Sequence, residues 1–146
     1  MQELVKNFIK IYEELNTKNI KTNINQFENI YHQNIFFKDP IHETNNLKEF
    51  KEYFLNSAIN LTHLKFTFKN HISNQETGYF EWDLCFSNEN INKGKKIYLE
   101  GCSAIKMKED TIYFHRDYYD LNEMVYSKVP ILKNVTSFIN KKISSK

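Results

Sequence analysis

The spacing between apolar residues changes at about residue 64, and this change restricts the possible folds more than any other feature of the chain. Before it, apolar side chains recur every three or four positions over 2–15, 23–31 and 47–58. After it, they alternate with polar ones over 64–72, 79–86, 95–107 and 111–119. The first spacing indicates helices and the second indicates half-buried strands. The order predicts an α+β domain in which three helices pack on a four-stranded antiparallel meander.

Two proline sites limit the helices. Pro40 follows a short extended stretch, 35–38, and disfavours a helical conformation at Asp39, so no helix continues through this segment. Pro130 stands near the first turn of a further amphipathic stretch, 129–143, where proline is well tolerated. We therefore predict a C-terminal helix after the last strand.

Composition excludes several classes of protein. A chain of 146 residues with 40% hydrophobic and 15% aromatic residues can form one core and is not intrinsically disordered. The net charge of +2 with scattered lysines does not predict nucleic-acid binding. The one basic cluster, Lys141, Lys142 and Lys146, is typical of a solvated helix end; contact with a membrane surface or an acidic partner is the alternative.

Location and cofactors are also constrained. No apolar run approaches the roughly 20 residues needed to span a bilayer, and the N-terminal stretch is unlike a signal peptide, so we expect a soluble cytoplasmic protein. Cys85 and Cys102 match no metal motif and are expected to be buried free thiols. The histidines lack paired metal-ligand spacing. We predict neither a metal nor a cofactor.

The run from Phe114 to Asp120 is the segment richest in reactive side chains, and it contains Arg116, the only arginine. On a strand, His115 and Asp117 share one face, and Arg116 points to the other with Tyr118 and Asp120. Alternation also groups Ile112 with Arg116 and Tyr113 with His115, and it does not decide which face is buried. We expect Arg116 to act as a clamp at the strand end or in an interface.

The chain as a whole resembles a known superfamily. The order of its elements and several local motifs are similar to the nuclear-transport-factor-2-like (SnoaL-like) superfamily, and within it to small bacterial proteins of unassigned activity. The motifs are the stretch 36–40, Trp82, Gly101, the run 115–120 and a tail with Glu123, Tyr126 and Pro130. The resemblance covers nearly the whole chain. It implies a single domain over 1–146, with a cone fold over 1–120 and a C-terminal helical extension over 121–146.

The resemblance also implies candidate chemistry. Enzymes of the superfamily place acid–base groups on the wall of an apolar pocket at the deep end of the cone. The ketosteroid isomerase pattern gives Tyr12 as oxyanion donor and Asp39 as proton-shuttling base, but Cys102 and Ser103 stand where its further acid belongs. A carboxylate in apolar surroundings has a raised pKa and can exchange protons near neutrality.

Two other enzyme patterns fit to different degrees. The epoxide-hydrolase pattern pairs Asp117 with Asp83, yet Glu81 occupies the place of its arginine, and alternation with Trp82 turns Asp83 outward. The polyketide-cyclase pattern relies on an acid–base aspartate with histidine support. Asp117 and His115 fit it best, because they lie two positions apart on one face.

Two hypotheses follow. In the first, the cone binds a small hydrophobic or aromatic metabolite and can isomerise, cyclise or hydrate it. Its candidate catalytic residues are Tyr12, Asp39, His115 and Asp117, and its candidate substrate-binding residues are Tyr31, Phe36 and Trp82. In the second, the protein is a non-catalytic module that forms a homodimer through the outer face of the sheet, and its C-terminal helix docks a partner or covers the mouth of the cone. A pocket with converging polar groups favours the first hypothesis, and a cone filled by rings opposes it.

Each candidate also has a purely structural explanation. Asp39 before Pro40 is a common turn arrangement, and Tyr12 lies on a helix stripe that must be buried in any case. His115 and Asp117 can form a hydrogen-bonded pair that lines a wall. Trp82 can be a core residue whose indole donates to a partner. Whether the protein is an enzyme therefore stays open at the level of sequence.

Overall fold

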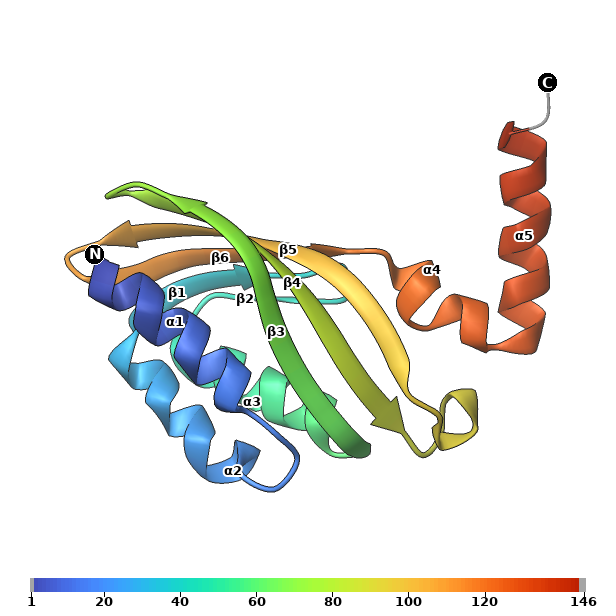
Figure 1. Ribbon diagram of the computed structural model, residues 1–146, viewed down its shortest axis with the longest axis horizontal. Helices are drawn as coiled ribbons and strands as arrows, with labels where there is room; N and C mark the ends of the chain where they lie inside the picture. Colours follow the sequence, from blue (N-terminus) through green and yellow to red (C-terminus); the bar gives the residue numbers. More distant parts are fainter. Residues whose placement is uncertain (1, 145–146) are drawn as a thin grey trace.

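The structure, a computed structural model, describes residues 2–144. Two helical segments come first, two strands precede the third helix, the four long strands of the curved sheet follow, and a helical tail ends the chain (Figure 1). The main helices are α1 (Gln2–Glu14), α2 (Ile20–Asn23), α3 (Leu47–Ala58), α4 (Leu121–Met124) and α5 (Pro130–Ser144). The strands are β1 (Tyr31–Lys38), β2 (Glu43–Thr44), β3 (Leu61–Ser73), β4 (Thr77–Asn88), β5 (Ile97–Lys108) and β6 (Thr111–Tyr119). The predicted α+β class is confirmed.

The sheet is larger than predicted and mixed rather than purely antiparallel. Its strand order is β2-β1-β6-β5-β4-β3. Strands β3 to β6 form the predicted antiparallel meander, and β1 adds to it by pairing in parallel with β6. The sequence suggested only a short extended stretch at 35–38. Because β1 runs beside β6, it carries Asp39 close to the end of that strand.

The second predicted helix, over 23–31, is wrong in its extent. Helix α2 ends at Asn23, a 3₁₀-helix η1 covers Ile24–Asn29, and Tyr31 already belongs to β1. A 3₁₀-helix also places residues three apart on one side, so it satisfies the same apolar spacing. Ile30 then accepts a hydrogen bond from the backbone of Ile112 at 2.8 Å, which starts the pairing with β6.

One irregularity in β6 sets the orientation of its side chains. Lys106 of β5 pairs with Phe114, but Met107 pairs with Ile112, so Tyr113 is an extra residue in the ladder. Such a bulge changes the phase of the alternation. Ile112 and His115 are both buried, at 0% and 1% exposure, whereas Tyr113 is 41% exposed. The predicted grouping of Tyr113 with His115 is therefore wrong.

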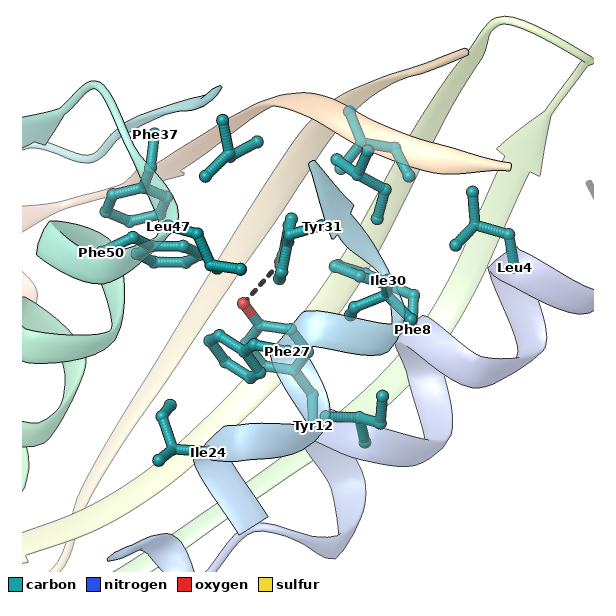
Figure 2. Packing of buried hydrophobic residues seen from close by; sticks show 14 of the residues in the cluster. Leu4, Phe8, Tyr12, Ile24, Phe27, Ile30, Tyr31, Phe37, Leu47 and Phe50 are labelled. Carbon is teal, nitrogen blue, oxygen red and sulfur yellow. Dashed lines mark hydrogen bonds between the residues drawn. The ribbon is translucent and has the colours of Figure 1, made fainter. Parts of the chain in front are cut away.

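The core lies between the helices and one face of the sheet, which we call the inner face. Large aromatic rings pack there among aliphatic side chains (Figure 2). Phe8 of α1, Phe27 of η1 and Phe50 of α3 are each fully buried. Phe27 and Phe50 lie 5.4 Å apart between ring centroids, and Phe8 lies 4.9 Å from Phe80 of β4. The rings fill the closed end of the cone, where the helices approach the sheet.

The tail leaves this body. Asp120 ends the last strand and caps α4, because its carboxylate accepts hydrogen bonds from the backbone of Asn122 and Glu123. Helix α5 stands away from the sheet and the N-terminal helices (Figure 1), and none of its residues is buried. The predicted helix over 129–143 is thus confirmed with bounds that differ by one residue at each end. Within residues 2–144, no helix combines the length and apolarity that crossing a membrane requires.

Candidate functional site

A continuous chain of hydrogen bonds connects α1, β1 and β6 across the core. The hydroxyl of Tyr12 lies 2.7 Å from that of Tyr31, as Figure 2 shows. The Tyr31 hydroxyl lies 2.7 Å from Nδ1 of His115, and Nε2 of His115 lies 2.7 Å from Oδ1 of Asp117. We call these four residues the relay. The sequence predicted all four as site residues, and the structure brings them together.

A second branch reaches the same carboxylate from β4 and β5. The indole nitrogen of Trp82 donates to Oγ of Ser103 at 2.9 Å, and that hydroxyl donates to Oδ1 of Asp117 at 2.5 Å. His115 Nε2 is also 3.3 Å from the same hydroxyl. Ser103 is buried, so its hydroxyl needs these partners. Oδ1 of Asp117 is therefore fixed from two directions.

The donors of the relay all point toward Asp117. An ionised carboxylate only accepts hydrogen bonds, so its contact with His115 requires a proton on Nε2. A neutral His115 then accepts at Nδ1 from Tyr31, which in turn accepts from Tyr12. Burial raises the pKa of both phenols well above the usual value, with the Asp117 charge adding to the effect on each. Both tyrosines therefore keep their protons and remain donors.

Asp117 is the member of the relay that reaches solvent. Its side chain is 20% exposed, whereas that of His115 is 1% exposed. Tyr12 and Tyr31 are 4% and 2% exposed. Within residues 2–144 its second oxygen, Oδ2, accepts no hydrogen bond. The relay thus ends in a single accessible carboxylate oxygen.

Asp39 forms a second polar centre just beyond β1. Oδ1 accepts hydrogen bonds from the backbone of Ile41 and His42, both at 2.8 Å, and Oδ2 accepts from the Tyr53 hydroxyl at 2.6 Å. The first two bonds are those of a turn closed by an aspartate. Burial raises the pKa of Tyr53, and its hydrogen bond to Asp39 raises it further. Asp39 therefore serves both as a turn residue and as the anchor of a phenol.

Tyr119 links the two centres. Burial raises its pKa most, followed by the charge of Asp39, and the charge of Asp117 contributes as well. The charge of Asp117 also raises the pKa of Tyr53. Both phenols thus lie within the field of two carboxylates and stay protonated at neutral pH.

Five rings lie around the relay, and we call them the mouth: Tyr53, Phe54, Phe66 and Tyr119 are half-buried, and Trp82 is buried. Between ring centroids, Phe66 lies 6.4 Å from Phe54 and 6.0 Å from Trp82. Trp82 lies 6.3 Å from Tyr119. The mouth combines aromatic surface with an accessible carboxylate.

The site differs in depth from the predicted pocket. The deep end of the cone, where the resemblance placed an apolar pocket, is filled by the protein's own rings, including Phe8, Phe27 and Phe50. A hollow of about 470 Å³ is lined instead by Lys65, Asp83 and other residues, none of which belongs to the relay. Any ligand of the relay must therefore bind at the mouth rather than in the deep end.

Phe36 is not at the site. Its ring stacks on Phe114 on the outer face of the sheet, with centroids 5.6 Å apart. Phe37 takes the inner position instead, where its ring meets the edge of His115 at 5.3 Å and stacks on Phe50 at 4.1 Å. Alternation back from Asp39 would have found this, because residues two apart on a strand share a face.

The outer face holds the remaining candidates. The Arg116 guanidinium lies over the Tyr118 ring at 4.6 Å, and Asp83 pairs with Lys69 at 3.0 Å. Both side chains lie on the opposite face of the sheet from the relay, which agrees with the predicted faces. Cys85 and Cys102 are free but only half-buried, so the expectation of buried thiols is wrong for their degree of burial. Burial nevertheless raises the pKa of Cys102.

Sequence reasoning missed three contributors to the site, namely Tyr53, Ser103 and Tyr119. Ser103 and Tyr119 lie on the inner face of strands whose alternation was readable, so their positions followed once the face of β6 was known. Tyr53 comes from α3 and meets Asp39 only in three dimensions. Among the described residues, no group of three histidine, cysteine or acidic side chains is arranged to hold a metal ion.

Gly101 makes room for this arrangement. It pairs with Trp82 on one side and with Tyr119 on the other. A Cβ atom added at this position would overlap the six-membered ring of Trp82. The absence of a side chain allows the indole to lie flat over β5 and reach Ser103.

Comparison with known proteins shows the fold. No protein-family model and no curated sequence matches the chain. A hypothetical protein from Catenulispora acidiphila with a ketosteroid isomerase-like fold, solved with trimethylamine, matches with a TM-score of 0.70 at 11% identity over 86% of this chain and 91% of its own. A protein from Jannaschia described as a SnoaL-like polyketide cyclase matches with a TM-score of 0.69 at 7% identity over 88% and 92%.

An epoxide hydrolase of the limonene-epoxide hydrolase type from Mycobacterium tuberculosis also matches, with a TM-score of 0.65 at 8% identity over 94% of this chain and 92% of its own. The chain therefore has the nuclear-transport-factor-2-like cone fold that its sequence predicted. The similar structures differ in their described activities. The fold alone does not select among them.

Proposed function

We propose that the protein binds a small molecule at the mouth and that Asp117 exchanges protons with it. The observation that carries this proposal is the relay, in which three buried groups are arranged around one accessible carboxylate. A buried histidine between a phenol and a carboxylate is costly to maintain unless every polar atom is satisfied. Here each atom has a partner, and only Oδ2 of Asp117 is left for a ligand.

Each residue has a definite role in this proposal. Asp117 is the catalytic residue, because Oδ2 can accept a proton from the ligand and return it at another atom. His115 and Ser103 are positioning residues that hold Oδ1. Tyr31 and Tyr12 fix the tautomer of His115, as the carboxylate does in other histidine-containing sites. Proton abstraction and return is the chemistry of isomerases and cyclases.

Asp39 takes a supporting role rather than that of the base. Both of its oxygens already accept hydrogen bonds from the turn and from Tyr53. It therefore holds Tyr53, and through its charge Tyr119, in the protonated form beside Asp117. A protonated phenol at this place can donate to an oxyanion that forms on the ligand.

The half-buried rings of the mouth favour a ligand with an aromatic or hydrophobic body, which stacks on Phe66 or Tyr119. A small organic cation is a second candidate. Neither Asp39 nor Asp117 forms an ion pair with a lysine or arginine within residues 2–144, and aromatic faces attract cations. The similar protein from Catenulispora acidiphila was solved with trimethylamine, which is a molecule of this class.

Native mass spectrometry of the protein purified from its own cells tests the proposal. We expect a small molecule that is retained by the wild type and lost in Asp117→Asn. Asp83→Asn is the matched control, because it makes the same change on the outer face. Retention of the same molecule by Asp117→Asn and His115→Gln would show that the site lies elsewhere.

A calorimetric titration with trimethylamine distinguishes the two ligand classes. Binding that is lost in Asp117→Asn but kept in Asp83→Asn favours the cation. Binding of neutral aromatic compounds alone favours the hydrophobic class. In either case the measurement concerns the same mouth.

A second candidate function is dimerisation through the outer face of the sheet. This face exposes three tyrosines, Tyr79, Tyr98 and Tyr118, at 48 to 70%. Exposed aromatic side chains are enriched at protein interfaces. We expect a homodimer in sedimentation equilibrium that Tyr98→Ser weakens, whereas a monomer at all concentrations would exclude it.

A further inference from the structure

Helix α5 carries a stripe of large apolar side chains that no other part of residues 2–144 covers. Their exposure ranges from 40 to 79% for Ile131, Leu132, Val135, Phe138, Ile139 and Ile143. At about 100° per residue, these positions lie within an arc of about 140° on one side of the helix. The helix stands away from the body (Figure 1), so its own domain does not bury the stripe.

The charge of the chain divides sharply at the same place. Residues 1–123 contain 18 acidic and 15 basic side chains, which is a net charge of −3. Residues 124–146 contain five lysines and no acidic residue, which is a net charge of +5. The small net charge of the whole protein therefore hides a basic tail on an acidic body.

The polar side of α5 is consistent with this division. It carries Lys133 and Lys141 among serine, threonine and asparagine residues. Lys142 falls within the apolar arc, and its ammonium lies 4.9 Å above the Phe138 ring. A lysine at such a position can extend its stem along an apolar surface and keep its charge in a polar layer.

We propose that α5 binds the surface of an anionic lipid bilayer. The helix would lie parallel to the surface, with the apolar stripe among the acyl chains and the lysines among the headgroups. A basic amphipathic helix of this kind binds through its apolar area and its attraction to anionic lipids. With 15 residues, α5 is about 22 Å long, which is too short to cross the hydrocarbon layer.

A second copy of the chain fits the stripe less well. The hollow on the sheet is lined by charged side chains, among them Lys65, Asp83 and Glu100. Another hollow, on α1, is lined by Ile9 and by Lys6, Lys10, Glu13 and Glu14. Charged side chains border both hollows, and six large apolar side chains bound there would take these charges out of water. A fluid apolar layer with an anionic surface matches both properties of the helix.

Co-sedimentation with lipid vesicles tests this inference on the full-length protein. We expect the protein to pellet with vesicles of phosphatidylcholine mixed with phosphatidylglycerol, and to stay in solution with phosphatidylcholine alone. High salt should release it. Replacing Lys133 or Lys141 by glutamine should weaken binding by about fivefold for each charge, because each lysine near an anionic surface contributes about 1 kcal/mol.

Variants of the apolar stripe distinguish lipid from protein partners. Phe138→Ser and Ile139→Ser should abolish pelleting without changing the fold, because both side chains are exposed. Asn140→Ser, on the polar side, is the matched control and should bind as the wild type does. Circular dichroism and the melting temperature verify that each variant is folded.

Two results would overturn the inference. One is the absence of pelleting with anionic vesicles, or pelleting that Phe138→Ser leaves unchanged. The other is a concentration-dependent dimer in sedimentation equilibrium that Phe138→Ser abolishes, which would assign the stripe to a second copy. The inference does not depend on the ligand site, since no residue of α5 belongs to it.

Discussion

The two faces of β6 carry similar kinds of side chain in very different surroundings. On the inner face, His115 bonds Tyr31, which lies 84 positions earlier in the chain. On the outer face, Arg116 contacts only its near neighbour Tyr118 among the ring contacts within residues 2–144. Both faces have aromatic and charged groups within a few residues. What distinguishes a candidate site is the set of buried partners from distant elements, and not the type of residue.

Replacing His115 by alanine should have the largest effect. It removes a buried ring and one hydrogen-bond partner each from the Tyr31 hydroxyl, which keeps Tyr12, and from the Asp117 carboxylate, which keeps Ser103. We expect a loss of about 3 kcal/mol in the free energy of unfolding, measured by urea denaturation. A loss below about 0.5 kcal/mol would mean that the inner network contributes no more than a surface contact.

Adding a methyl group at Gly101 should have the next largest effect. In Gly101→Ala the new Cβ would overlap the Trp82 ring and displace it from Ser103. Overpacking of this kind costs about 1–3 kcal/mol. Cys102→Ala, at the next position and on the outer face, is the control and should change the unfolding free energy much less. Equal effects of the two substitutions would contradict the proposed role of Gly101.

The buried phenols predict a specific dependence of stability on pH. Burial raises the pKa of Tyr12 and Tyr31 in the folded protein, so above about pH 10 the unfolded chain loses protons that the folded one keeps. The two phenols therefore do not change the free energy of unfolding below about pH 10. Above that pH the free energy of unfolding falls by about 1.4 kcal/mol per pH unit for each buried phenol. Tyr12→Phe should make this fall shallower in urea titrations. An equally steep fall in the variant would show that Tyr12 does not take part.

The outer face should give the smallest effect. Arg116→Ala removes a contact with Tyr118 at the surface, which is worth about 0.5 kcal/mol. We expect the denaturation midpoint to move only slightly, in contrast to His115→Ala one position earlier. A large loss in Arg116→Ala would mean that the outer face is buried in solution by a second copy.

Much of the fold followed from the sequence, because it depends on periodicity. The alternation in β4 placed Trp82 inside and Asp83 outside, as the structure has them. The pairing of His115 with Asp117 followed from the same rule. Pairing between distant elements was less accessible, and so the parallel contact of β1 with β6 was not predicted.

The errors at the site have physical causes. Phe36 and Phe37 are adjacent and chemically alike, so the type of residue does not decide which ring faces His115, and the choice depends on alternation along β1 counted from Asp39. Tyr53 lies on a helix whose rotation about its axis is set by packing. The filled deep end of the cone reflects the size of the side chains that meet there, which no local pattern reveals.

The bulge at Tyr113 allows one strand to serve two purposes. Upstream of it, β6 must present Ile112 to the core, and downstream it must present His115 and Asp117 to the site. These positions differ by an odd number, so a regular strand could satisfy only one of the two demands. The extra residue shifts the alternation of side chains by one position. The core residue Ile112 and the site residues His115 and Asp117 therefore follow two different phases of alternation along one strand. The single extra residue, Tyr113, connects the two phases.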